Sequence, residues 1–129
     1  MATPHPTEGE LAILRVLWSR KVPMTVREVH EVLCRSRDTA YTTVLTMLSI
    51  MAEKRLVRRD DSARSHTYQP VHDEPAVQAS MLKDLVRRAF SGSALTLVQR
   101  ALDDEKTSAE DLEAISKLIA QAKARRRKA

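Results

Sequence analysis

Residues 39–54 read TAYTTVLTMLSIMAEK. Apolar residues recur in this stretch at the three- and four-residue spacing of an amphipathic helix, which predicts a helix capped by Asp38 or Thr39 and ending near Lys54. The buried stripe of this helix is predicted to consist of Ala40, Val44, Met47, Leu48 and Met51.

The opposite face of the same helix carries an unusual number of hydroxyl groups. Threonine is a mediocre helix former, and exposed helix positions are normally filled by longer polar residues. Its hydroxyl can bond to bases or phosphates and its methyl can contact thymine, so the face favours binding to DNA. A solvated polar face without a partner is the alternative. The residues on this face are Thr39, Thr42, Thr43, Thr46, Ser49 and Glu53, with Ile50 at its edge.

Two shorter amphipathic segments precede this helix. Thr7 and Glu10, and again Thr25 and Glu28, have the spacing of a capping box, which predicts that one helix starts at each threonine. The predicted buried residues are Leu11, Leu14, Leu17 and Trp18 in the first helix and Val26, Val29, Val32 and Leu33 in the second.

Two β-prone runs, Leu56–Arg59 and Arg64–Val71, follow the third helix on either side of a polar turn. They predict a β-hairpin. Three helices and a hairpin are the layout of a winged helix-turn-helix domain, in which the third helix enters the major groove and the hairpin lies along the backbone. We therefore expect a mainly α protein with a small β-hairpin, whose DNA-binding domain covers residues 1–72.

Residues 73–129 contain three more amphipathic segments, which begin near Asp73, Ser93 and Ser108. They hold too few apolar residues for a separate core, so we predict a dimerisation domain whose apolar faces are covered by a second copy of the chain. Folding back onto the first half is the alternative. The candidate dimerisation residues are Leu82, Leu85, Val86, Phe90, Leu95, Val98, Leu112, Ile115, Leu118 and Ile119.

The composition limits the possible functions. With two glycines and one cysteine among 129 residues, the chain has no Gly-rich phosphate loop, paired-cysteine metal cluster or disulfide framework. The formal net charge of +5 favours an acidic partner such as nucleic acid. No apolar run approaches the roughly 20 residues of a membrane helix, and no secretory signal is evident, so we expect a cytoplasmic protein without a membrane partner.

The sequence predicts no catalytic, cofactor or metal site. His30 and Cys34 lie four residues apart on the second helix, but two ligands do not make a metal site. We expect Cys34 near the core and His30 at the surface. Because no nucleophile has a base and an acid at suitable positions, an enzyme is not expected.

Several segments resemble the penicillinase-repressor family of winged-helix regulators, which includes the β-lactamase, methicillin-resistance and copper-transport repressors. The resemblance runs from about Thr7 to Ile119. It rests on Leu17-Trp18, Val26-Arg27-Glu28-Val29, Ala40-Tyr41-Thr42-Thr43-Val44-Leu45-Thr46-Met47-Leu48, Glu53-Lys54-Arg55-Leu56-Val57 and the hairpin segment Arg64-Ser65-His66-Thr67-Tyr68.

This resemblance implies a homodimeric transcriptional repressor whose two third helices each read half of an inverted-repeat operator in a promoter. When the family's DNA-contacting positions are transferred to this sequence, the resemblance assigns base contacts to threonines that the helical pattern also places on the exposed face. The implied DNA-binding residues are Thr42, Thr43 and Thr46 at the bases, Thr39 and Tyr41 near the backbone, Thr25 and Arg27 at phosphate, and Arg64 in the wing.

The chain also departs from the family pattern. Ile50 stands where members often have arginine, and Arg55 where they often have glycine, so operator choice is expected to differ. Antibiotic-responsive members of the family are inactivated by cleavage of an Asn-Phe bond. The matching positions in this chain are Arg100 and Ala101, which are therefore the candidate site for a signalling protease. Neither residue is the one that the family has at that position. The paired cysteines of copper-responsive members are absent, because no cysteine follows Cys34.

A second hypothesis is a helical dimer that acts as a protein-protein adaptor and uses the winged-helix layout without reading DNA. The hairpin distinguishes the two hypotheses. Reversing the charges of Arg58, Arg59 and Arg64 would leave the function of an adaptor intact.

Overall fold

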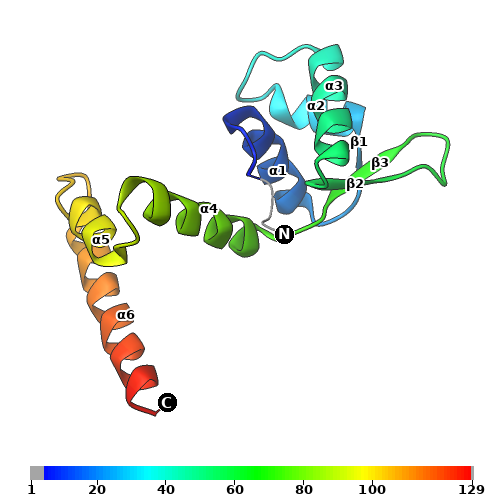
Figure 1. The fold of residues 1–129 in the computed structure, drawn as a ribbon. Coiled ribbons are helices and arrows are strands. Elements are labelled where there is room, and N and C mark those ends of the chain that lie inside the picture. The colour runs from blue at the N-terminus through cyan, green and yellow to red at the C-terminus, as the bar shows by residue number, and fades with distance from the viewer. Residues whose placement is uncertain (1–4, 129) are drawn as a thin grey trace. The chain divides into compact units, whose positions relative to one another are not determined.

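The computed structural model describes residues 5–128, and Figure 1 shows the order of their helices and strands. Contacts between residues divide the chain into two units, and the division falls inside α4, between Asp84 and Leu85. The elements are α1 (Glu8–Arg20), β1 (Met24–Thr25), α2 (Val26–Leu33), α3 (Tyr41–Glu53), β2 (Val57–Asp60), β3 (Thr67–Pro70), α4 (Glu74–Ala89), α5 (Ala94–Leu102) and α6 (Ala109–Lys128).

Capping boxes start α1 and α2, as the sequence predicts. The Thr7 hydroxyl accepts a hydrogen bond from the Glu10 backbone N–H at 3.2 Å, and the Glu10 carboxylate accepts one from the Thr7 N–H at 2.8 Å. Thr25 and Glu28 repeat this pair at 3.2 Å and 2.9 Å. Both boxes satisfy backbone donors that a helix start would otherwise leave unpaired.

The third helix begins differently from the prediction. Its N-cap is Ala40, which offers no side-chain acceptor, so the predicted cap on Asp38 or Thr39 is wrong. Ala40 is also exposed rather than buried, because its extended backbone places it before the first helical turn. The rest of the predicted stripe faces the core: Val44, Leu48 and Met51 are buried, and Met47 is half-buried.

The end of α3 is a Schellman motif. Arg55 has a positive φ of 64°, its N–H donates to the Ala52 carbonyl at 3.1 Å, and the Leu56 N–H donates to the Met51 carbonyl at 2.9 Å. This pair of bonds closes a helix through one residue in the left-handed conformation, a position that favours glycine. The motif turns the chain from α3 directly into β2.

The predicted hairpin is present and belongs to a three-stranded antiparallel sheet of order β1-β3-β2. In the hairpin Val57 pairs with Pro70 and Asp60 with Thr67. Strand β1 was not predicted; Met24 pairs with Tyr68 and Thr25 with Thr67. It joins the start of α2 to the hairpin, and Figure 1 shows the loop between β2 and β3 extending away from the three helices.

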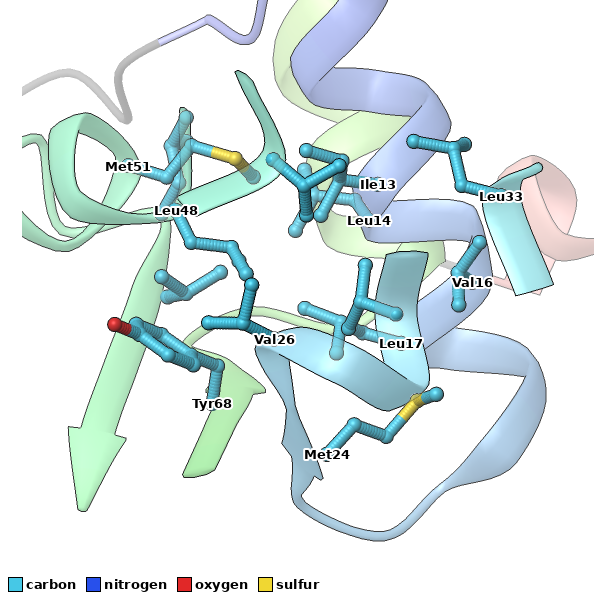
Figure 2. Packing of buried hydrophobic residues seen from close by; sticks show 14 residues of the cluster. Ile13, Leu14, Val16, Leu17, Met24, Val26, Leu33, Leu48, Met51 and Tyr68 are labelled. Atoms are coloured by element: carbon cyan, nitrogen blue, oxygen red, sulfur yellow. The ribbon is translucent and has the colours of Figure 1, made fainter. Parts of the chain in front are cut away.

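One hydrophobic core holds α1, α2, α3 and the sheet together (Figure 2). Burying each large apolar side chain contributes about 1.5–3 kcal/mol, so this core is the main source of stability in the first unit. Its fully buried members are Ile13, Leu14, Leu17, Val29, Val44, Leu48 and Met51. Because α3 contributes three of these side chains, the orientation of its opposite face is determined by the core.

The second unit comprises the end of α4 and helices α5 and α6. Ser93 and Ser108 accept hydrogen bonds from Thr96 and Asp111 backbone N–H groups at 3.1 Å and 3.0 Å, which confirms the predicted starts of α5 and α6. No side chain of α5, or of α6 as far as Lys128, is buried. Within residues 5–128, no helix combines the length and the apolar character needed to cross a bilayer.

Candidate nucleic-acid interface

The exposed face of α3 presents three threonine hydroxyls without a partner. Thr42, Thr43 and Thr46 are exposed, and none of their hydroxyls makes a hydrogen bond within residues 5–128. The Ser49 hydroxyl on the same helix differs, since it donates back to the Leu45 carbonyl at 3.0 Å. The three threonines are therefore free to bond to an external ligand.

The first turn of α3 is electrostatically suited to an anion. It has neither a side-chain cap nor an acidic residue, whereas the first turns of α1 and α2 contain Glu10 and Glu28 in capping boxes. Uncapped backbone N–H groups and the helix dipole give such a terminus a partial positive charge. Phosphate groups bind readily at helix starts of this kind.

A hollow of about 400 Å³ lies between the starts of α2 and α3 and the hairpin. It brings together Thr25, Arg27 and Tyr41, three of the residues that the family resemblance implies near the DNA backbone. Leu45 and His66 also line it. Arg27 and Tyr41 are exposed, while Thr25 is half-buried and its hydroxyl caps α2.

The cations of the wing differ in their local partners. The Arg59 guanidinium pairs with Asp61 at 2.8 Å, and Asp61 also accepts a hydrogen bond from His66. The bond from His66, followed by the charge of Arg59, lowers the pKa of Asp61 despite partial desolvation. Arg64 is exposed and has no ion pair among the described residues, so its charge is available to a ligand.

Thr39 is half-buried, and the structure gives its backbone a role of its own. Its carbonyl oxygen accepts hydrogen bonds from the side chains of His30 and Cys34 on α2. The expectation that Cys34 lies near the core is wrong, because the side chain is exposed; His30 is half-buried. Cys34 follows the last turn of α2, beyond the residues that face the core.

Two exposed apolar residues of α3 lie beside the threonines: Ile50, which the helical pattern placed at the edge of this face, and Leu45, which it did not include. Leu45 and Ile50 are 41% and 42% exposed, at the edges of the threonine face. Both lie outside the stripe of Val44, Leu48 and Met51, so the helical projection that placed Ile50 at the edge of the face could also have identified Leu45. Apolar side chains at such positions can contact the methyl group of thymine.

The candidate dimerisation residues are largely accessible. Leu95 and Leu118 are 79% and 60% exposed. Leu82, Leu85, Val98, Leu112 and Ile119 are also exposed, and Val86, Phe90 and Ile115 are half-buried. Leu102, which was not among the candidates, is 38% exposed.

The candidate protease site lies inside a helix. Arg100 and Ala101 are exposed residues of the last turn of α5, and Arg100 pairs with Asp103 at 3.6 Å. Proteolytic cleavage is most frequent in exposed loops, so cutting this bond would require the turn to unwind.

Across residues 5–128, no three His, Cys, Asp or Glu side chains gather in an arrangement that could hold a metal ion.

Comparison with known proteins agrees with this architecture. The penicillinase repressor family model matches residues 6–121. The transcriptional regulator BlaI of Mycobacterium tuberculosis is 38% identical over 116 residues, which cover 89% of this chain and 83% of the relative. The penicillinase repressor of Bacillus licheniformis is 21% identical over 124 residues, covering 96% of each chain. These relatives are transcriptional regulators rather than enzymes, and this chain, with its winged-helix fold, is a member of the penicillinase repressor family.

Proposed function

We propose that two copies of this chain form a homodimer that binds an inverted-repeat operator in promoter DNA and represses transcription. The observation that carries the proposal is the face of α3, where the hydroxyls of Thr42, Thr43 and Thr46 are exposed and have no partner among the residues that the structure describes. Such a repressor acts where the chromosome lies, which favours the cytoplasm as its compartment.

The dimensions of α3 support insertion into DNA. Its 13 residues span about 20 Å, and the major groove is wide enough to admit a helix of this kind. The uncapped first turn would face phosphate, the three threonines would face base edges, and Arg64 would reach the backbone from the wing. Backbone contacts supply affinity, and base contacts supply sequence preference.

The apolar surfaces of α5 and α6 support the homodimer. Leu95, Leu112 and Leu118 are each at least 45% exposed, and neither helix buries a side chain. Several exposed large apolar side chains on adjacent segments of a chain favour an interaction surface. A second copy offers the same surface, and a two-fold dimer would match the symmetry of an inverted repeat.

Selection of DNA from a randomised duplex pool by the purified protein tests sequence-specific binding. We expect enrichment of an inverted repeat whose half-sites lie about one helical turn, or a multiple of it, apart. Anisotropy titrations of the enriched duplex should show log K falling with log salt at a slope of about −5 or steeper if six or more phosphates are neutralised.

A pool that shows no enrichment, or an affinity that does not depend on salt, would refute the DNA-binding proposal. Reversing the charges of Arg58, Arg59 and Arg64 adds a control in cells. If the charge-reversed protein still exerts its full biological effect, the chain acts as an adaptor between proteins instead.

A further inference from the structure

The junction between α2 and α3 is held by two side chains that converge on one backbone atom. His30 Nε2 lies 2.8 Å from the Thr39 carbonyl oxygen, and Cys34 Sγ lies 3.3 Å from the same oxygen. The two side-chain atoms are 3.2 Å apart. His30 lies in the last turn of α2 and Cys34 is the C-cap of that helix, while Thr39 lies just before α3.

The Thr39 carbonyl oxygen determines which side-chain atoms carry the donated hydrogens. A carbonyl oxygen only accepts hydrogen bonds and has two lone pairs, so His30 donates from Nε2–H and Cys34 donates from S–H. This bond selects the Nε2–H tautomer when the imidazole of His30 is neutral. One carbonyl oxygen is therefore doubly satisfied by side chains of the preceding helix.

The imidazole of His30 also contacts the first residue of α3. Its ring centroid lies 5.7 Å from that of Tyr41, with an angle of 80° between the ring planes. This is the edge-to-face geometry that aromatic rings prefer. His30 thus touches the residues on both sides of Ala40, which is the N-cap of α3 and has no side-chain cap of its own.

Within residues 5–128, no other hydrogen bond fixes residues 38 and 39 of the segment between α2 and α3. Backbone bonds to α2 end with the Arg37 N–H donating to the Leu33 carbonyl, and those of α3 begin with the Val44 N–H donating to the Ala40 carbonyl. Between them, the only hydrogen bonds of residues 38 and 39 within the described chain are the two at the Thr39 oxygen.

We propose that His30 and Cys34 are positioning residues for DNA recognition, because they set the backbone path into α3 and hence the placement of Thr42 and Thr43. This inference rests on the proposed function. The pair contributes little to the core: Cys34 is exposed, His30 is half-buried, and α2 packs through Val26, Val29 and Leu33. Loss of the pair should therefore change DNA binding more than it changes stability.

Matched substitutions test the hydrogen bonds. His30→Leu removes the donor, whereas His30→Gln retains an N–H at a similar reach; Cys34→Ala and Cys34→Ser form an equivalent pair. Each variant is titrated with the duplex enriched by selection and with a random duplex, and its urea midpoint is measured. We expect His30→Leu to lose about tenfold affinity or more for the enriched duplex and less than about twofold for the random one.

The conservative variants separate positioning from general stability. We expect His30→Gln and Cys34→Ser to bind the enriched duplex within about threefold of the wild type, because both still donate to the Thr39 carbonyl. Equal losses in His30→Gln and His30→Leu would overturn the proposal, as would a fall in the urea midpoint that accounts for the loss of affinity.

Chemical modification gives an independent test that does not depend on whether a variant folds. Cys34 is the only cysteine of the chain and is exposed, so iodoacetamide treatment of the folded protein alkylates a single thiol. Alkylation replaces the S–H donor, and we expect the treated wild type to lose affinity for the enriched duplex while treated Cys34→Ser does not. Unchanged binding after complete alkylation, together with unchanged binding by His30→Leu, would overturn the inference.

The outcomes also separate this inference from the proposed function. If the wild-type protein does not distinguish any enriched duplex from random DNA, the proposed function fails and the inference fails with it. If the wild type discriminates but both the alkylated protein and His30→Leu discriminate equally well, the inference alone is wrong.

Discussion

Lys54 Nζ donates hydrogen bonds to both carboxylate oxygens of Glu10, at 3.1 Å and 3.0 Å. Glu10 is 4% exposed and is the one charged residue buried among those described. The same carboxylate accepts the backbone N–H of Thr7 in the capping box of α1. This ion pair therefore joins the start of α1 to the end of α3 and helps to hold α3 on the core.

Replacing Glu10 by glutamine should destabilise the protein by about 1–2 kcal/mol, because the substitution weakens the cap and removes the charged partner of Lys54. The loss is limited because the Lys54 side chain is 39% exposed and can be hydrated. Urea denaturation measures the change. Glu28→Gln is the matched control, since Glu28 occupies the same position in the box of α2 but is exposed and has no lysine partner in the described part of the chain. A loss as large in Glu28→Gln would show that the ion pair adds nothing.

The same carboxylate makes stability depend on pH. Burial raises the pKa of Glu10, but hydrogen bonds from Thr7 and Lys54 and the charge of Lys54 outweigh burial and hold the pKa below its ordinary value of 4.5. A carboxylate whose pKa is lower in the folded state than in the unfolded state stabilises the protein at pH values above the unfolded-state pKa. This stabilisation is lost as the pH falls through the folded-state pKa. Between about pH 6 and pH 3, the urea midpoint of the wild type should therefore fall further than that of Glu10→Gln. Parallel pH profiles would contradict this assignment.

Replacing Arg55 by glycine should stabilise the protein by about 0.5–1 kcal/mol, because Arg55 occupies the left-handed position of the Schellman motif, with φ at 64°. The greater freedom of glycine in the unfolded chain offsets part of the gain. Thermal or urea unfolding measures the difference. Arg55→Ala removes the same side chain but keeps the strain, so it should show no gain; equal stabilisation by both variants would assign the effect to the lost charge instead.

Thr43→Ala and Thr46→Ala should each weaken binding to the enriched duplex by about 1–3 kcal/mol and should change binding to random DNA much less. The reason is that base contacts carry sequence preference, whereas phosphate contacts do not. Ser49→Ala on the same helix is the control, because its hydroxyl already bonds to the Leu45 carbonyl. If the threonine variants lose equal affinity for both duplexes, these residues do not contact bases.

Arg64→Ala should make the negative slope of log K against log salt shallower by about 1 for each DNA-bound wing. The reason is that Arg64 has no ion pair within the described chain. Arg59→Ala should change the slope less, since Asp61 already neutralises part of the charge of Arg59. Asp61→Asn should have the opposite effect, so the protein should bind DNA more tightly and the slope should become steeper. A larger effect of Arg59→Ala than of Arg64→Ala would show that Arg59 leaves Asp61 when DNA binds.

Leu118→Glu should convert the proposed dimer into a monomer at micromolar concentration, because Leu118 is 60% exposed on α6 and a carboxylate at an apolar interface would be desolvated. Size-exclusion chromatography with light scattering measures the mass. Lys117→Glu, at the neighbouring exposed position, should leave the dimer intact. A wild-type protein that is already monomeric would refute the dimer itself.

Local patterns predicted many of the helices and strands of the first unit correctly. The capping boxes at Thr7 and Thr25 marked the starts of α1 and α2 because the groups that bond are three residues apart and need no tertiary contact. The start of α3 was predicted wrongly for the converse reason. Asp38 and Thr39 are good caps in isolation, yet the backbone at Thr39 is held by side chains from another helix.

The sequence alone determined the element types, the two faces of α3 and the hairpin, because helical and strand periodicities depend on neighbouring residues. Only the tertiary structure decided that β1 pairs with β3, that Glu10 bonds to Lys54, and that His30 bonds to Thr39. Each of these contacts joins residues that no local periodicity relates, and each forms only after packing of the core has brought its two partners within bonding distance.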